Sequence, residues 1–192
     1  MCTSPNSGEP VPPPYRIIYA DPPWQFKTYS EKGKGKSPER HYHCMTLDQI
    51  KALPVASIAN DNCALFLWTT LPHIEHALEV VRAWGFTYKT TAFVWVKPSK
   101  GSTGWHWGCG YWTRANAELV LLGTRGHPKR VSGGVHQIVS APVGEHSAKP
   151  PEVRERIIKL LGDIPRIELF ARGATPVGWN VWGNECKSDI IL

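Results

Sequence analysis

The chain has 192 residues, which is enough for one domain with a single core but too few for a catalytic domain plus a separate target-reading domain. Hydrophobic residues make up 42% of the sequence, charged residues 20%, and the net charge is +6, a balance that argues against a disordered or fibrous chain. No apolar run approaches the ~18 residues of a membrane span, and the N-terminus lacks the pattern of a signal peptide. Five scattered cysteines argue against a disulfide framework and predict a reducing, cytoplasmic location.

The excess of positive over negative charge falls in two segments punctuated by glycines. Residues 27–43 hold five basic residues against two acidic ones, and residues 97–130 hold six against one. One lysine-rich stretch is as often a solvated loop as a binding site. Two such segments in one domain favour a phosphate backbone, and therefore a nucleic acid, as the partner.

The expected elements alternate between strands and helices along the chain. Residues 1–14 contain five prolines and almost nothing to bury, which predicts a flexible arm ahead of a single domain at residues 15–192. The domain opens with the apolar run Arg16–Ala20, a buried strand that two prolines end. Further strands are expected at residues 63–69, 87–96, 119–122, 137–139, 166–170 and 179–182, and helices at residues 46–53, 72–84 and 151–161.

This alternation predicts an α/β fold in which helices cover both faces of one sheet. In open sheets of this kind, ligands bind beyond the carboxyl ends of the strands. Asp21, Thr69, Lys97 and Arg172 each follow an expected strand closely. The chemistry is therefore expected at this edge of the sheet.

The most specific motif is Asp21-Pro22-Pro23-Trp24, directly after the first strand. Its prolines fix the backbone, leave the Pro22 carbonyl without a ladder partner and hold the Asp21 carboxylate beside it. The exocyclic amine of a purine is a poor nucleophile until two acceptors bind its hydrogens, and these two oxygens are such acceptors. Trp24 could stack on the base. The alternative is a plain turn in which Asp21 caps backbone amides.

From about residue 15 to residue 186, the sequence resembles the MT-A family of adenine N6-methyltransferases. This family includes the catalytic subunit of the eukaryotic mRNA adenosine methyltransferase, with bacterial and phage relatives. The matching pieces, in order, are Tyr19–Trp24, Tyr42, Met45-Thr46, Leu65–Trp68, Trp84–Phe86, Val94–Lys97, Trp112, Glu118, His146–Pro150, Ile167–Arg172 and Gly183–Glu185. The resemblance implies a Rossmann-like, mostly parallel methyltransferase sheet with permuted motif order, so that the catalytic motif precedes the cofactor-binding segment.

Two departures from the family stand out. Longer members carry an acidic residue on an upstream strand that holds the cofactor adenine, and the proline-rich arm replaces that strand here. The lysine-rich insert between Trp24 and Tyr42 is also longer than in the eukaryotic members.

The resemblance implies S-adenosylmethionine as the methyl donor. Lys149 takes the position that reaches the carboxylate end of this cofactor, a role that suits a cation. Glu168 could instead be an ordinary member of an ion pair. The cofactor-binding residues that the resemblance implies are Asp21, Lys149, Glu168, Phe170, Arg172, Asn184 and Glu185, and the catalytic ones are Asp21, Pro22, Pro23 and Trp24.

A sulfonium methyl group is already activated, so catalysis needs the amine held in line at about 3–3.5 Å, without a covalent intermediate. An adenine inside a duplex cannot present its amine, so the base must be flipped or single-stranded. The expected substrate-binding residues are Lys34, Lys36, Arg40, Tyr42, Trp68, Lys97, Trp107, Trp112 and Arg114. The tryptophans of the loop at residues 98–116 could equally cover the core.

A zinc site is a weak alternative, because its candidates His41, His43, Cys44, His106 and Cys109 include no Cys-x-x-Cys pair, and we expect no metal. The compact chain favours DNA over RNA as the substrate. An RNA methyltransferase and a catalytically silent nucleic-acid-binding relative remain alternatives. Target specificity would come from loops, from a homodimer or from a partner subunit.

Overall fold

The computed structural model describes residues 14–25, 44–101, 103–110, 112–144 and 148–192, and every structural statement below concerns these residues. They form one seven-stranded sheet with the strand order β5-β3-β4-β2-β1-β6-β7. Only β4 runs antiparallel to its neighbours among these strands. The strands are β1 (Tyr15–Ala20), β2 (Ala59–Thr69), β3 (Thr87–Val96), β4 (Ala117–Arg125), β5 (Ile138–Ser140), β6 (Arg166–Leu169) and β7 (Asn180–Trp182).

The helix ends agree with the boundaries predicted at Thr46, Gly85 and Gly162. Thr46 caps α1 (Leu47–Ala52) through a capping box with Gln49, as predicted. A 3-10 turn, η3 (Leu71–His73), leads into α3 (Ile74–Ala83), and Gly85 follows it with a φ of +80°. Helix α4 (Glu152–Leu161) ends at Gly162. The four-residue helix α2 (Val55–Ile58) was not predicted, because it is too short to show a helical period.

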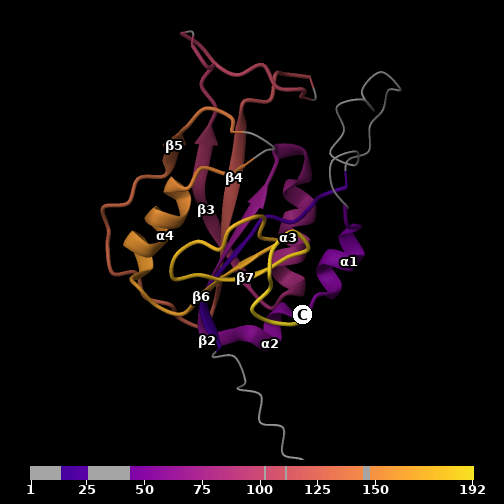
Figure 1. Ribbon diagram of the computed structural model, residues 1–192, viewed down its shortest axis with the longest axis vertical. Helices are drawn as coiled ribbons and strands as arrows, with labels where there is room; N and C mark the ends of the chain where they lie inside the picture. Colours follow the sequence, from indigo (N-terminus) through magenta and orange to yellow (C-terminus); the bar gives the residue numbers. More distant parts are fainter. Residues whose placement is uncertain (1–13, 26–43, 102, 111, 145–147) are drawn as a thin grey trace, which may run out of the picture.

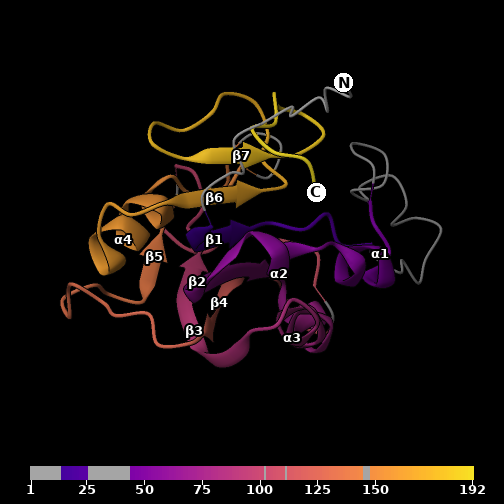
Figure 2. The same cartoon turned by 90° about the horizontal axis from the view of Figure 1, so that it is seen from below.

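The helices cover both faces of the sheet, which confirms the predicted layers. Figure 2 shows α1 and α3 on one side of the strands and α4 on the other. Alternate residues of β1 point into two separate cores. Ile18 packs with residues of α1, α2 and α3, whereas Ile17 and Tyr19 pack with Val153 and Ile157 of α4. The mostly parallel α/β sheet agrees with a Rossmann-like methyltransferase fold.

The strand order reverses beside β1, and this reversal positions the site. β1 pairs in parallel with β2 on one side and with β6 on the other, with Ala20 opposite both Leu67 and Leu169. In an open sheet such a switch point leaves a crevice at the carboxyl ends of the strands. Because β1, β2, β3 and β6 are parallel, the segments that follow them meet at one edge, as predicted for Asp21, Thr69, Lys97 and Arg172. This edge is uppermost in Figure 1.

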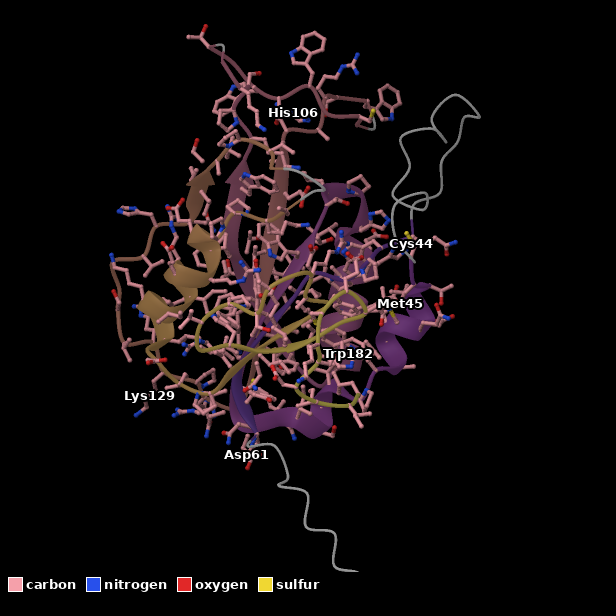
Figure 3. The ribbon with its side chains drawn as sticks, viewed as in Figure 1. Cys44, Met45, Asp61, His106, Lys129 and Trp182 are labelled. Atoms are coloured by element: carbon pink, nitrogen blue, oxygen red, sulfur yellow. The ribbon has the colours of Figure 1, made fainter. Side chains whose placement is uncertain are left out.

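The basic residues of segment 97–130 do not form one surface, which corrects the expectation of a second basic loop. Strand β4 (Ala117–Arg125) lies inside this segment, so the residues before the strand and those after it are at opposite ends of the sheet. Figure 3 shows His106 at one end of the molecule and Lys129 at the opposite end, near Asp61. The other basic segment, residues 27–43, lies outside the described residues, as do residues 1–13 of the proline-rich arm. Within the described ranges, no helix is long and apolar enough to cross a membrane.

Candidate functional site

Asp21 is the first residue beyond β1, and the backbone of its motif is fixed by neighbouring segments. The Asp21 amide donates to the carbonyl of Leu169 at 3.4 Å, and the Pro23 carbonyl accepts from the Met45 amide at 3.0 Å. The Pro22 carbonyl accepts from the Trp24 amide at 2.9 Å, whereas the sequence had suggested a carbonyl without a partner. A carbonyl oxygen has two lone pairs, so this bond leaves Pro22 able to accept from a substrate.

Four charged side chains of alternating sign meet beside Asp21. Lys149 Nζ donates to Asp21 Oδ2 at 2.7 Å and lies 3.5 Å from Glu118 Oε2. Lys97 Nζ donates to the other oxygen, Glu118 Oε1, at 2.5 Å. Burial raises the pKa of Glu118, but Lys149 and Lys97 outweigh it, so the pKa lies below the ordinary value. We call this set, in the order Lys97, Glu118, Lys149 and Asp21, the four-charge row.

A cavity of about 630 Å³ lies between α1 and the segments that follow β6 and β7. Its wall includes Pro23, two positions after Asp21, but no residue of the four-charge row, so the predicted cofactor residues Asp21 and Lys149 do not line it. The structure brings together on its wall Pro23 and four of the predicted cofactor residues, namely Phe170, Arg172, Asn184 and Glu185. The wall also contains residues that the sequence did not single out for this role, including Cys44, Met45, Gln49, Leu53 and Trp182. Figure 3 shows Cys44 and Met45 beside α1, with Trp182 on the segment facing them.

The shape of the cavity wall depends on a close approach of two backbone segments. Arg172 and Glu185 form an isolated parallel bridge, and their side chains lie 3.9 Å apart. A Cβ on Gly183 would lie 2.4 Å from the carbonyl oxygen of Ala171, so only glycine permits this approach. Phe170 has a φ of +62° and packs edge-on against Trp182, with 5.4 Å between the ring centroids. A non-glycine residue in this left-handed region is uncommon and often marks a functional site.

The residues present fit S-adenosylmethionine. The cavity volume is in the range of small-molecule sites, about 300–1,000 Å³, and its wall combines aromatic rings with the polar side chains of Arg172, Asn184 and Glu185. Such a wall suits an adenosyl group. Outside the cavity wall, the Asp21–Lys149 pair presents one anion and one cation, which matches the ammonium and carboxylate of an amino acid.

Two aromatic residues predicted to touch the substrate are buried instead. Trp24 is 6% exposed, donates from Nε1 to the carbonyl of Trp68 at 3.2 Å and stacks on His73. Trp68 is 1% exposed and donates to the hydroxyl of Tyr19 at 2.6 Å. Lys149 Nζ lies 5.4 Å from the centroid of the Trp68 ring. Both tryptophans therefore support the site from the core and do not offer an open face to a base.

Glu168 is also committed to the protein interior, as its alternative interpretation allowed. Its carboxylate accepts two hydrogen bonds from Arg154 of α4, at 2.6 and 2.7 Å. This pair fastens α4 to β6 below the site. The bond to Glu168 raises the pKa of Arg154 although burial opposes it. The structure thus differs from the expectation that Glu168 contacts the cofactor, and Glu168 does not line the cavity.

The aromatic loop beyond β3 and β4 is exposed, which argues against its role as a cover for the core. Trp105, Trp107 and Trp112 are 54%, 76% and 98% exposed. The guanidinium of Arg114 lies 5.2 Å from the centroid of the Trp107 ring. Figure 1 shows this loop projecting beyond the sheet at the edge that carries the four-charge row. Lys97, by contrast, is directed to Glu118 and not to the surface.

Several sequence predictions fall on residues that the structure does not describe. They are the substrate-binding candidates Lys34, Lys36, Arg40 and Tyr42, and the zinc candidates His41 and His43. Within the described part of the chain, no three His, Cys, Asp or Glu side chains are grouped so that they could hold a metal ion.

The chain is similar over most of its length to known methyltransferases. Residues 15–185 match the MT-A70 family. The Type II methyltransferase M.MunI from Mycoplasma sp. is 35% identical over 194 residues, which cover 92% of this chain and 80% of that protein. Human METTL3, an N(6)-adenosine-methyltransferase catalytic subunit, is 28% identical over 93% of this chain and 29% of its own length. Human METTL4, an N(6)-adenine-specific methyltransferase, is 32% identical over 89% of this chain and 37% of its own length.

Proposed function

Because this chain belongs to the MT-A70 family of adenine N6-methyltransferases, we propose that it transfers a methyl group from S-adenosylmethionine to the N6 amino group of adenine in DNA. The observation that carries this proposal is the Asp21–Lys149 pair, at 2.7 Å, two residues ahead of Pro23 on the wall of the cavity bounded by Phe170, Arg172 and Glu185. The similarity to a Type II methyltransferase over most of its length supports DNA. The METTL3 relatives make RNA the second candidate.

Different residues of this chain bind the amino acid end and the adenosyl group of the cofactor. When bound, S-adenosylmethionine supplies a methyl group on a positively charged sulfur. Lys149 binds its carboxylate and Asp21 its ammonium, because opposite charges favour these contacts. Phe170, Arg172, Asn184 and Glu185 hold the adenosyl group in the cavity, where the Glu185 carboxylate can accept from ribose hydroxyls.

Catalysis in this proposal consists of orienting one amine. The Asp21 carboxylate and the second lone pair of the Pro22 carbonyl accept the two hydrogens of the adenine amino group, which favours a pyramidal, nucleophilic nitrogen. A carboxylate has about four lone-pair sites, so Asp21 can accept from Lys149, from the cofactor ammonium and from the adenine amine together. The proton leaves to solvent after transfer, and no covalent enzyme intermediate is formed.

The aromatic loop and the lysine-rich insert bind the nucleic acid strand in this proposal. The exposure of Trp107 and Trp112 supports stacking on unpaired bases. Arg114, beside Trp107, adds a charge for the phosphate backbone. Lys34, Lys36, Arg40 and Tyr42 belong to the second binding segment by sequence alone. Stacking of this kind requires that the target adenine be flipped out or single-stranded.

We further propose that residues 15–192 form one catalytic domain and that residues 1–14 form an arm. Cys63, Cys109 and Cys186 form no disulfide, which supports our proposal that the protein functions in the reducing cytoplasm. We also propose that target specificity comes from the loops, from a homodimer or from a partner subunit.

The proposal is tested by incubating the protein with a radiolabelled methyl donor and methylation-free DNA or RNA, followed by nucleoside mass spectrometry. We expect N6-methyladenine in DNA and, in competition, little labelling of RNA. Labelling of RNA alone would establish the second candidate. A protein that binds both polymers but labels neither would be a silent relative.

A further inference from the structure

The four-charge row connects strands that are far apart in the sequence but adjacent at one edge of the sheet. Lys97 follows β3, Glu118 is the second residue of β4, and Asp21 follows β1. Lys149 lies between the two carboxylates, closer to Asp21 Oδ2 (2.7 Å) than to Glu118 Oε2 (3.5 Å). The side chains of Lys97, Glu118 and Lys149 are each about 15% exposed or less, so water screens their charges weakly.

Lys97 is held too firmly to serve as a mobile contact for phosphate. Its amide donates to the carbonyl of Asn116 at 2.9 Å, and its own carbonyl accepts from the amide of His106 at 2.8 Å. Its Nζ donates to Glu118 Oε1 at 2.5 Å and lies 4.4 Å from the centroid of the Trp95 ring. Its charge is therefore used inside the protein.

The position of Lys149 depends on how strongly Glu118 attracts it. With Lys97 present, one oxygen of Glu118 is neutralised and Lys149 remains with Asp21. Without Lys97, Lys149 would be the one cation that the described structure places against Glu118. The two would then draw together, and Lys149 would move away from Asp21 and from the cofactor carboxylate.

We propose that Lys97 is a positioning residue that acts through Glu118 to keep Lys149 at Asp21, where it binds the carboxylate end of the methyl donor. This inference rests on the proposed function, because it takes Lys149 as the residue that binds that carboxylate. It replaces the expectation that Lys97 contacts the nucleic acid.

The experiment compares the binding of two ligands by calorimetry. S-adenosylhomocysteine carries the amino acid end, and 5′-methylthioadenosine lacks it but keeps the adenosyl group. We expect K97M to weaken S-adenosylhomocysteine binding about tenfold, as is typical for coupled residues of one charge network. Binding of 5′-methylthioadenosine should not change, and K97R should restore most of the lost affinity.

A second substitution separates positioning from direct contact. In the double variant K97M/E118Q, no unneutralised Glu118 charge remains to attract Lys149, so S-adenosylhomocysteine affinity should return to within about threefold of the wild-type value. If K97M and K97M/E118Q bind equally weakly, or if K97M binds as the wild type does, the inference is wrong. If K97M does not unfold cooperatively, and is therefore not properly folded, K97Q replaces it in the same comparison. The glutamine side-chain amide of K97Q removes the charge but can still donate a hydrogen bond to Glu118.

The K149A variant distinguishes this inference from the proposed function. Suppose that K149A loses affinity for S-adenosylhomocysteine but not for 5′-methylthioadenosine, whereas K97M binds both ligands as the wild type does. The proposed function is then supported and the inference about Lys97 is wrong. If the wild type binds neither ligand, the proposed function itself fails.

Discussion

Lys149 donates a hydrogen bond to Asp21 across 128 positions of the sequence, with 2.7 Å between Nζ and Oδ2. Both side chains are partly buried, at 14% and 26% exposure. The pair joins the residue after β1 to the loop before α4, at the point where the strand order reverses. Since an amino acid carries one positive and one negative group, this pair supports the proposal that Asp21 and Lys149 bind the amino acid end of the methyl donor.

Lys149→Ala should weaken S-adenosylhomocysteine binding by roughly 30-fold or more, because truncating one partner of a buried charge pair costs about 2–5 kcal/mol. Calorimetry measures this affinity. Lys129→Ala is the matched control, since Lys129 is exposed at the opposite end of the molecule. If K149A and K129A have equal affinity for S-adenosylhomocysteine, Lys149 does not bind the cofactor.

Glu118 should make the stability of the fold depend on acidity. The pKa of Glu118 is lower in the folded protein than the ordinary value of 4.5, because Lys149 and Lys97 overcome the opposing effect of burial. Its contribution to the free energy of unfolding is therefore complete above about pH 4.5 and is lost as the pH falls through the lower folded value. Thermal unfolding of the wild type and E118Q should differ most near pH 7 and converge in acid. A difference that grows in acid would contradict this sign.

Gly183→Ala should damage the cavity wall. The added Cβ would approach the carbonyl oxygen of Ala171 to 2.4 Å, so the segments after β6 and β7 must separate. We expect a loss of about 1–3 kcal/mol in the free energy of unfolding and weaker binding of both S-adenosylhomocysteine and 5′-methylthioadenosine. Gly133→Ala is the control, because nothing lies within 4 Å of its Cβ. If both variants behave alike, close approach at Gly183 is not what shapes the cavity.

Trp107→Ala should weaken binding of single-stranded DNA by about 5- to 150-fold, which corresponds to about 1–3 kcal/mol per stacked base. Binding of S-adenosylhomocysteine should not change, because Trp107 does not line the cavity. Fluorescence anisotropy of a labelled oligonucleotide measures the loss. Tyr88→Ala removes an exposed aromatic ring from the start of β3 and serves as the control. Undiminished DNA binding by W107A would assign the exposed loop to another partner.

The sequence predicted the fold wherever a period or a cap was strong. The alternation of β-branched and aromatic residues set β3 at Thr87–Val96, and the apolar spacing with Gly85 set α3. The start of β2 was missed, because Asn60, Asp61 and Asn62 are polar, Asp61 and Asn62 are exposed, and the three lie where the register between β1 and β2 shifts. An irregularity of this kind leaves no periodic signal.

The position of the candidate site could be predicted from the sequence, but its side-chain contacts could not. Asp21 was expected at the edge of the sheet because it follows a buried strand. The association of Lys97 with Glu118 follows from the pairing of β3 with β4, which no local pattern reveals. Aromatic identity also does not distinguish a buried ring from an exposed one. Trp24 and Trp68 therefore proved to be core residues, whereas Trp107 and Trp112 are exposed.

The most direct measurement is methyl transfer by the wild type and D21N to an oligonucleotide with a single adenine, read by nucleoside mass spectrometry. With the wild type, we expect one methyl group on the adenine N6. With D21N, the rate at saturating methyl donor should fall roughly 100-fold or more, as for the loss of a preorganised electrostatic contact, while the exposed control D48N keeps full activity. Undiminished turnover by D21N, or a methyl group on any other atom, would contradict the account.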